Sequence, residues 1–273
     1  MYEWRLLLSG AGTGAYNMAV DEALLNGVIA RTSPPTLRFY TWRRECLSFG
    51  FLQKVDDQIR KNCGNRGVEM VRRPTGGYAV LHGRDLCYSV AAPLAALGAF
   101  SPGEAFRLLG TALSTGLCHL GVPVALALCE ERETLTTEKF SCAASLSLHE
   151  IVADGKKIAG SSSLRRKGHY LQHGSIFLEY DGERIAELLK GNDVEFGVGV
   201  SRSGGLRQGR GKKFPLTELI SVLSRGFREE LKVTLVPAGL EVAEENAVQK
   251  LLAEKYANLD YRRQRGRLSQ QYA

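Results

Sequence analysis

The fold is decided by the stretch from Ser147 to Tyr180, SLHEIVADGKKIAGSSSLRRKGHYLQHGSIFLEY. It predicts three strands, which lie at 147–153, from 157 to about 164, and at 169–180. Asp154-Gly155, between alternating apolar residues, is a strong hairpin signal, and Arg165-Arg166-Lys167-Gly168 predicts the second turn. Successive hairpins indicate that the centre of the molecule is an antiparallel sheet.

The segments around this stretch alternate between short strands and helices. Further strands are predicted at 4–9, 36–40, 46–50, 69–72, 78–81 and 85–91, and the last two are expected to pair with each other. Helices are predicted at 15–25, 55–62, 101–120, 215–231 and 241–256. This order favours an α+β fold with a mixed, largely antiparallel central sheet flanked by helices. The chain has neither a G-x-G-x-x-G after a strand nor a P-loop motif, so neither nucleotide-binding site is supported.

The bulk composition is that of a globular protein. Of the 273 residues, 44% are hydrophobic and 24% charged, and no apolar run approaches the roughly 20 residues that span a membrane. The segment after Met1 has no basic stretch followed by an apolar one, as a secretory signal would. We therefore expect a cytoplasmic protein without a membrane partner.

Charge and cysteine usage narrow the possible partners. The net charge of +7, part of it in the Gly- and Arg-rich segment 201–213, favours acidic partners. Nucleic acid is not expected, because aromatic and basic residues do not interleave. The six cysteines (46, 63, 87, 118, 129 and 142) lack zinc-ligand spacing, so no metal is expected. Cys87 alternates within a strand pattern and is interpreted as structural.

Cys142 and Lys157 are the candidate catalytic pair. The hairpin at Asp154-Gly155 returns the chain and brings the lysine toward the cysteine. A thiol nucleophile beside an amine that moves protons is the minimum equipment for acyl transfer through a thioester. The alternative at this point is that Cys142 is a small core residue.

Two further segments have the composition of binding loops. In Arg72-Arg73-Pro74-Thr75-Gly76-Gly77, the glycines allow a ligand to approach the backbone, and exposed N–H groups can bind a carbonyl or phosphate oxygen. The alternative is a plain turn with solvated arginines. His82 and His173 can orient a substrate or act as bases, or they can be satisfied structural histidines. Gly174, directly after His173 in a strand, indicates a close approach to the backbone.

These segments together resemble the signature series of the biotin/lipoate protein ligase superfamily. The series also includes Asn17–Leu24, Phe39-Tyr40-Thr41-Trp42 and Lys157-Ile158-Ala159-Gly160-Ser161. The resemblance implies one catalytic domain at 1–260, with 261–273 as a basic tail. It implies that substrate is bound by Arg72, Arg73, Thr75, Gly76, Gly77, His82, Gly160, Ser161, His173 and Gly174.

The cysteine position points to one branch of the superfamily. Cys142, Glu150-Ile151 and then Lys157 are spaced as in the octanoyltransferases that modify the glycine-cleavage H protein. That resemblance implies that octanoate passes from acyl carrier protein to Cys142 and then to a lysine of a lipoyl domain, without ATP, metal or another cofactor. The chain departs from the branch at Ala143–Ser147 and at Gly83, where an acidic residue often follows the histidine.

Three alternatives remain at this level. An ATP-dependent lipoate ligase would use Lys157 to contact an acyl-adenylate and would leave Cys142 as a bystander. An amidotransferase would move octanoate between lipoyl domains. A basic acyl-binding or nucleic-acid-binding module would have no catalytic activity at all.

Overall fold

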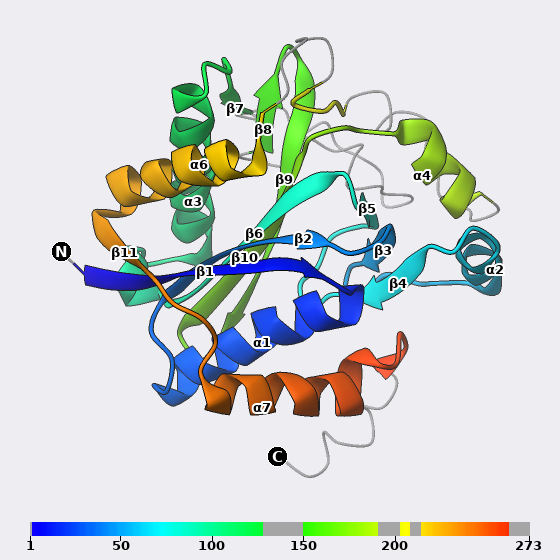
Figure 1. Ribbon diagram of the computed structural model, residues 1–273, viewed down its shortest axis with the longest axis horizontal. Coiled ribbons are helices and arrows are strands. Elements are labelled where there is room, and N and C mark those ends of the chain that lie inside the picture. The colour runs from blue at the N-terminus through cyan, green and yellow to red at the C-terminus, as the bar shows by residue number, and fades with distance from the viewer. Residues whose placement is uncertain (1, 128–149, 191–202, 208–213, 262–273) are drawn as a thin grey trace.

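An eight-stranded mixed sheet forms the centre of the protein in the computed structural model, which describes residues 2–127, 150–190, 203–207 and 214–261 (Figure 1). In spatial order its strands are β11 (Val233–Pro237), β1 (Tyr2–Gly12), β2 (Thr36–Trp42), β6 (Asp85–Pro93), β10 (His169–Phe177), β9 (Lys156–Arg166), β8 (Glu150–Ala153) and β7 (Ala125–Ala127). β1 pairs in parallel with β2 and β11, and the other pairs are antiparallel. The predicted α+β architecture is confirmed.

A second, three-stranded sheet lies beside one end of the large one. It has the order β4 (Glu69–Arg72), β3 (Cys46–Phe49) and β5 (Val80–His82). Two helices, α2 (Asp57–Asn65) and α4 (Gly182–Leu189), pack near it through a small core that includes Leu47, Phe49 and Leu188. Of the candidate site residues, His82 lies on β5, His173 and Gly174 lie on β10, and Lys157, Gly160 and Ser161 lie on β9.

Helices cover both faces of the large sheet (Figure 1). α3 (Pro102–His119) and α6 (Leu216–Leu231) lie on one face, and α1 (Gly14–Ala30) lies on the other. α7 (Val242–Leu251), which a helical turn at Leu252–Tyr256 extends, packs on the outer side of α1. α1 is therefore enclosed on two sides, which explains why it is apolar almost all round and why its Asp21 is fully buried.

The crossing of α3 and α6 depends on two small residues. A Cβ atom on Gly226 would lie 2.3 Å from the Ala112 carbonyl oxygen, and one on Gly116 would lie 2.7 Å from the Leu223 Cα. The two helices therefore approach too closely for any side chain at these positions. Around the crossing, Phe39, Tyr88 and Phe227 fill the core, and burying such a side chain contributes about 1.5–3 kcal/mol.

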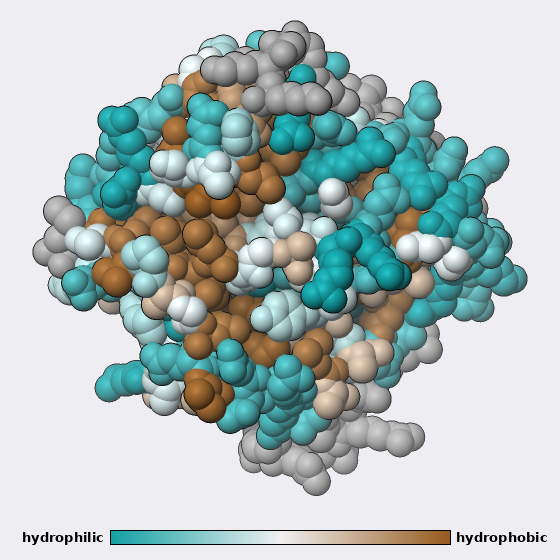
Figure 2. Space-filling view, viewed as in Figure 1, coloured by the Kyte–Doolittle hydropathy of each residue, from teal (hydrophilic) through white to brown (hydrophobic). Residues whose placement is uncertain are grey.

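The surface reflects this layering. Figure 2 shows apolar side chains gathered over the middle of one face, where β1 and β11 form one edge of the sheet, and hydrophilic side chains around α2 and α4. Tyr2, Leu8 and Val236 are among the exposed apolar residues. In the part of the chain that the structure describes, no helix has both the length and the apolar character that spanning a bilayer requires.

Both predicted turns of the central stretch are confirmed. The β8–β9 hairpin turns at Asp154 and Gly155, with φ of 51° and 70°, and the β9–β10 hairpin turns at Lys167 and Gly168, with φ of 49° and 75°. Two successive positive φ values are the geometry of tight hairpins that follow the twist of the sheet. The predicted strand at 147–153 is confirmed from Glu150 onward, and its first three residues lie outside the described part.

The predicted pairing of 78–81 with 85–91 is wrong. β5 pairs with β3 in the small sheet, whereas β6 lies between β2 and β10 in the large one. The chain changes sheet at Gly83, where φ is +126°, and the Gly83 N–H donates to the Asp85 carboxylate at 2.9 Å. β6 is buried along nearly its whole length, so it needs a strand on each side, which the shorter β5 does not provide.

Candidate active site

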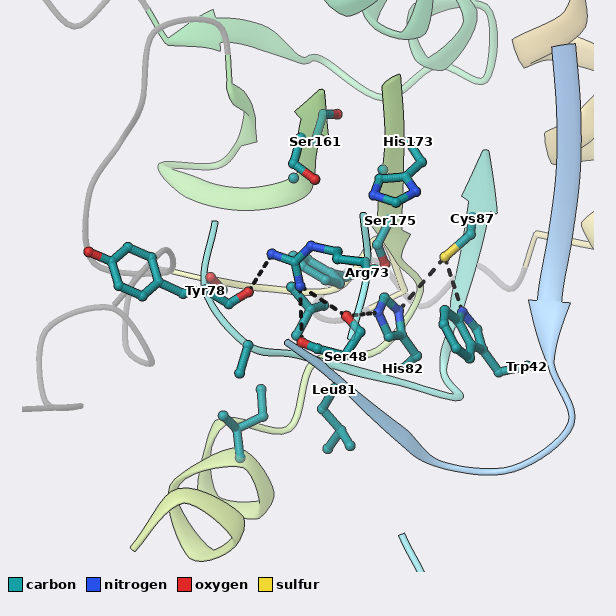
Figure 3. Close-up of a pocket in the computed structure, with 18 of the residues that line it drawn as sticks. Trp42, Ser48, Arg73, Tyr78, Leu81, His82, Cys87, Ser161, His173 and Ser175 are labelled. Atoms are coloured by element: carbon teal, nitrogen blue, oxygen red, sulfur yellow. Dashed lines mark hydrogen bonds between the residues drawn. The ribbon is translucent and has the colours of Figure 1, made fainter. Parts of the chain in front are cut away.

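A largely apolar cavity opens between the two sheets (Figure 3). Its empty volume is about 1060 Å³, including the open mouth. Apolar side chains from both sheets, from α1 and from α4 form much of the wall, among them Met18, Trp42, Leu81, Phe177, Ile185 and Leu189. The polar groups on its surface come from a few positions, among them Ser48, Arg73, His82, Lys157 and His173.

Lys157 reaches the cavity because β9 has a bulge. Ile151 of β8 is opposite Ala159, but Val152 is opposite Lys157, so Ile158 is an extra residue. The bulge places Lys157 on the same side as Gly160, and a Cβ atom on Gly160 would lie only 3.1 Å from the Lys157 Cε. The glycine thus leaves room for the lysine side chain.

A carboxylate holds the Lys157 amine at the wall. The Nζ atom donates to Glu150 Oε1 at 2.5 Å, and the side chains are only 8% and 5% exposed. Lys157 lines the cavity, whereas Glu150 supports it from β8. A buried ion pair of this kind fixes the direction of the amine.

The predicted nucleophile, Cys142, lies outside the described residues. Among the cysteines that the structure describes, Cys87 lines the cavity, and Cys46 and Cys63 are buried in the cores. Burial, with the nearby Asp85 carboxylate, raises the pKa of Cys87 well above its usual range. Burial also raises the pKa of Cys63 to about 11. Thiols with raised pKa values are protonated near neutral pH, so these cysteines are poor nucleophiles.

Arg73 organises the turn that follows β4. Its guanidinium donates to the carbonyl oxygens of Gly76 and Tyr78 at 2.9 and 2.7 Å and to that of Ser48 at 3.0 Å. It lines the cavity, whereas Gly76 and Gly77 are exposed and do not. The structure therefore separates the arginine from the two glycines that the sequence grouped with it.

Arg72 lies on the other side of the strand from the cavity. It donates to the carbonyl oxygens of Gly50, Gln53 and Leu259 at 2.9, 2.6 and 3.0 Å. It is buried and does not line the cavity. The contacts make Arg72 a brace between the loop after β3 and the C-terminal helical segment.

Ser48, His82 and Asp85 form a hydrogen-bonded series at the cavity, here called the cavity triad. Ser48 Oγ lies 2.8 Å from His82 Nε2, and His82 Nδ1 lies 2.6 Å from Asp85 Oδ2. The His82 ring stacks on Trp42 at a centroid distance of 4.0 Å. Burial opposes ionisation of Asp85, but His82, Ser175 and the Gly83 N–H outweigh it and hold the pKa of this carboxyl below its usual value.

Asp85 supplies a carboxylate next to the turn at Gly83. It stands three positions after His82 and bonds the His82 imidazole. The turn at Gly83 brings it back to the ring.

A second series of the same type, Thr75, His173 and Asp21, is called the buried triad. Thr75 Oγ1 lies 2.6 Å from His173 Nε2, and His173 Nδ1 lies 2.9 Å from Asp21 Oδ2. Asp21 pairs with Arg38 at 2.7 Å, and both side chains are fully buried. His173 reaches the cavity wall, but Thr75 does not and instead bonds Ser162 at 2.7 Å.

Burial shifts both ionisable groups of the buried triad. Burial lowers the pKa of His173, although the Asp21 carboxylate acts in the opposite direction. Burial opposes ionisation of Asp21, but Arg38 and His173 outweigh it and lower the pKa of that carboxyl. Near neutral pH the triad therefore contains a neutral imidazole and a carboxylate paired with an arginine.

Gly160, Ser161 and Gly174 form the tight contact between β9, β10 and β6. Ser161 Oγ lies 2.8 Å from the Tyr88 hydroxyl. A Cβ atom on Gly174 would lie 2.5 Å from Tyr88 Cε1 and 2.7 Å from the Gly160 carbonyl oxygen. The close approach that the sequence predicted at Gly174 is thus made by the neighbouring strands.

One group of side chains in the described part has metal-ligand character. His82 Nδ1, an Asp85 oxygen and Cys87 Sγ lie within 4.8 Å of one another. His82 and Asp85 are 2.6 Å apart, which is a hydrogen-bond distance, and Cys87 Sγ is 3.3 Å from the same Asp85 oxygen. A tetrahedral ion with bonds of about 2.0–2.3 Å would need to spread these atoms. The prediction that the chain holds no metal stays a prediction.

Four polar groups of the site had no role in the expectations from sequence. Asp21 stands in the Asn17–Leu24 motif, and Glu150 was a spacing marker, so both were visible but unassigned. Asp85 lay in a strand pattern. Ser48 carried no signal, because nothing local indicates that its hydroxyl meets an imidazole 34 positions later.

Known proteins resemble this chain over nearly its whole length. The family described as the lipoyl protein ligase A/B catalytic domain matches residues 13–228. Octanoyltransferase LipM of Brevibacillus brevis is 36% identical over 268 residues, which cover 94% of this chain and 97% of the relative. LipM of Clostridioides difficile is 31% identical over 277 residues, which cover 97% of this chain and all of the relative.

Solved structures show the same fold. A lipoate-protein ligase A bound with ATP aligns with a TM-score of 0.76 at 24% identity, over 95% of this chain and 98% of its own. A bipartite lipoate protein ligase from Thermoplasma acidophilum, described with its E2 lipoyl domain, aligns with a TM-score of 0.76 at 23% identity, over 96% of each chain. At this level of identity the likeness concerns the fold alone.

Proposed function

The chain belongs to the lipoyl protein ligase A/B catalytic-domain family and is an acyltransferase; from this premise we propose that it transfers octanoate in protein lipoylation through a thioester on Cys142. The donor is octanoyl-acyl carrier protein, and the acceptor is a lysine of a lipoyl domain, that of the glycine-cleavage H protein. The full-length relatives named Octanoyltransferase LipM support the acyl group and the pathway.

The observation that carries this proposal is the position of Lys157. Its amine lies in the wall of an apolar cavity, a bulge directs it there, and Glu150 holds it. An amine oriented in this way can take a proton from an attacking group and return it to a leaving group. A lysine that served only solubility would lie on the surface.

In the first half-reaction, the Cys142 thiolate attacks the octanoyl thioester of the carrier. The acyl carbon gains the bond to Cys142 Sγ and loses the bond to the carrier sulfur. The carrier leaves as a thiol, with its proton supplied through Lys157. The octanoyl chain occupies the apolar wall of the cavity, where burying each CH₂ group contributes about 0.8 kcal/mol.

In the second half-reaction, the amine of the lipoyl-domain lysine attacks the octanoyl-Cys142 thioester. An amide forms, the cysteine leaves as a thiolate, and Lys157 receives the proton of the attacking amine. An amide is more stable than a thioester, so this step requires neither ATP nor a metal. The net charge of +7 steers acidic carrier and lipoyl domains toward the enzyme.

We assign the substrate-binding roles by distance from the cavity. Arg73, His82, Gly160, Ser161, His173 and Gly174 line it and bind the acyl donor directly. Thr75 acts through His173. Arg72, Gly76 and Gly77 shape the adjoining loop, whose exposed glycines are available to the partner protein.

The test is the intact mass of the protein after incubation with octanoyl-acyl carrier protein and without ATP. We expect an octanoyl adduct that hydroxylamine removes and that Cys142→Ala lacks. Cys118→Ala is the matched control, because Cys118 is exposed on the outside of α3 and should keep the adduct. Lys157→Ala should slow both half-reactions by about 10²–10⁴-fold.

Other outcomes would replace the proposal. Lipoyl-domain modification that requires ATP and free octanoate would make the protein a ligase. Adduct formation from an octanoylated lipoyl domain, but not from the carrier protein, would make it an amidotransferase. Wild-type transfer by Cys142→Ala would eliminate the thioester mechanism altogether.

A further inference from the structure

We propose that the cavity triad is a second nucleophilic centre: Ser48, activated by His82 and Asp85, hydrolyses medium-chain acyl esters and thioesters independently of Cys142. The hypothesis concerns described residues only, and it does not depend on the octanoyl-transfer function. It adds a hydrolase activity to the same cavity.

The distances are those of a nucleophile, a base and an orienting acid. Ser48 Oγ is 2.8 Å from His82 Nε2, and His82 Nδ1 is 2.6 Å from Asp85 Oδ2. The shorter contact of each imidazole nitrogen follows the order of Ser-His-Asp catalysis on unrelated folds, and Cys87 Sγ makes a longer contact of 3.8 Å with Nδ1. The stacking of His82 on Trp42 fixes the plane of the ring.

The neighbouring donors determine the direction of each hydrogen bond. The Asp85 carboxylate accepts from Ser175, Cys87 and the Gly83 N–H, so it also accepts from His82 Nδ1–H. His82 Nε2 is then an acceptor, and the Ser48 hydroxyl donates to it.

Arg73 is the second hydrogen-bond partner of Ser48 Oγ. Its Nη1 donates to Ser48 Oγ at 3.1 Å, which leaves the serine proton directed at the imidazole (Figure 3). The guanidinium also places positive charge beside Ser48 Oγ, where it favours the alkoxide form of the serine as His82 takes the proton. The cation therefore stands at the end of the triad where the chemistry would take place.

Access restricts the substrate. Ser48 lines the cavity but is only 1% exposed, so a bulky ester on the protein surface cannot reach it. The wall beside it is apolar, with Trp42, Leu81 and Phe177. A straight acyl chain with its carbonyl at the inner wall meets both conditions.

The reaction is balanced without a further reagent. Ser48 Oγ bonds to the acyl carbon, the carbon–sulfur or carbon–oxygen bond to the leaving group breaks, and the serine proton passes through His82 to the leaving group. Water then attacks the Ser48 ester, its proton passes to His82 and on to Ser48 Oγ, and the free acid departs.

The test uses the full chain with Cys142→Ala, so that the cysteine takes no part. We expect a fluorophosphonate probe to add covalently to Ser48, as mapped by peptide mass, and 4-nitrophenyl octanoate to be hydrolysed. Adding Ser48→Ala should remove the adduct and lower hydrolysis at least tenfold. Octanoyl-N-acetylcysteamine in a parallel assay measures the thioester reaction.

Ser89→Ala in the same background is the matched control. Ser89 is also 1% exposed, but its hydroxyl donates to Asp21 and not to a histidine, and Ser89 does not line the cavity. This variant should keep both the adduct and the hydrolysis, while a thermal melt shows that all variants are folded. A folded Cys142→Ala protein with no Ser48 adduct, or equal hydrolysis with and without Ser48, would refute the hydrolase.

The two proposals fail separately. In the protein with Cys142 intact, Ser48→Ala should lower the release of free octanoate and leave the octanoyl-Cys142 adduct detectable. Loss of the octanoyl adduct in Cys142→Ala bears on the transferase proposal and not on the hydrolase proposal.

Discussion

The cavity triad and the buried triad have the same order of groups but opposite placement of charge. Each joins a hydroxyl to Nε2 of a histidine and Nδ1 of that histidine to an aspartate. In the buried triad the arginine, Arg38, pairs with the aspartate at 2.7 Å. In the cavity triad the arginine, Arg73, donates to the serine at 3.1 Å.

This difference separates a structural network from a reactive one. A cation on the carboxylate pairs with the acid, across the imidazole from the hydroxyl. A cation at the hydroxyl favours the alkoxide form of the nucleophile, while the carboxylate remains able to support an imidazolium. Hydrogen-bond order alone therefore does not identify a nucleophile, and the location of the nearest cation has to be considered as well.

The strongest test of the comparison is to neutralise each aspartate. Asp21→Asn leaves Arg38 as an uncompensated buried charge, so we expect a loss of about 3–5 kcal/mol in the free energy of unfolding. Asp85→Asn leaves no buried arginine without its partner, so it should lower the free energy of unfolding by less. It should also abolish hydrolysis at Ser48. Urea unfolding of both variants measures this, and equal losses would contradict the contrast.

A second test disturbs both triads through one strand. Gly174 lies between His173, which bonds Asp21, and Ser175, which bonds Asp85. Gly174→Ala places a Cβ atom 2.5 Å from Tyr88 Cε1, and such overpacking costs about 1–3 kcal/mol. The expected result is a lower unfolding midpoint in urea together with weaker transfer and hydrolysis.

Gly155→Ala is the control for this glycine. Gly155 has open space around it, but its φ is +70°, so only backbone strain contributes. Gly155→Ala should lower the urea midpoint of unfolding and leave the ratio of the hydrolysis rate to the transfer rate unchanged. A Gly174→Ala variant as active as wild type would show that β10 adapts.

The third test removes the two hydroxyls. Thr75→Val and Ser48→Ala each remove a hydrogen bond to a histidine, and each should cost about 1 kcal/mol in the free energy of unfolding. Only Ser48→Ala should lower hydrolysis in the Cys142→Ala background. If Thr75→Val lowered hydrolysis as much as Ser48→Ala does, the Arg73 cation beside Ser48 would not be what distinguishes the two triads.

The smallest expected effect is the pH dependence of the buried triad. Burial lowers the pKa of His173 in the folded protein below its usual value of about 6.5. At pH values between the folded pKa and the usual pKa, the unfolded state therefore binds more protons than the folded state. This contribution to stability is complete above that usual value and is lost as pH falls through the folded pKa. His173→Gln, which cannot titrate, should flatten the decline in unfolding free energy below about pH 6.5. If the slope of unfolding free energy against pH is unchanged in His173→Gln, other titrating groups cause the decline.

The central hairpins illustrate what local sequence predicts well. Asp154-Gly155 and Lys167-Gly168 adopt two successive positive φ values, a conformation that depends on the turn residues themselves. The resemblance to the ligase superfamily named Lys157, His82 and His173 as site residues, and in the structure all three line one cavity. The error at 78–91 arose because two neighbouring strands of suitable pattern belong to different sheets.

The partners of the site residues were less predictable. Glu150 was visible in the spacing, but its contact with Lys157 depends on a bulge, which changes the side of the strand on which the lysine lies. Arg72 and Arg73 are neighbours in sequence, yet one braces a loop and the other lines the cavity. Adjacent strand residues point to opposite faces, and the sequence does not state which face meets the cavity.

By itself the sequence determined the α+β class and the two central hairpins, because periodicity and turn chemistry are local properties. The tertiary structure alone decided that Ser48 and not Thr75 faces the cavity, and that Arg73 adjoins a hydroxyl while Arg38 adjoins a carboxylate. These contacts join strands and a helix far apart in the chain, Asp21 and His173 by 152 positions. Packing of the two sheets around α1 fixes them, and no short stretch of sequence contains that information.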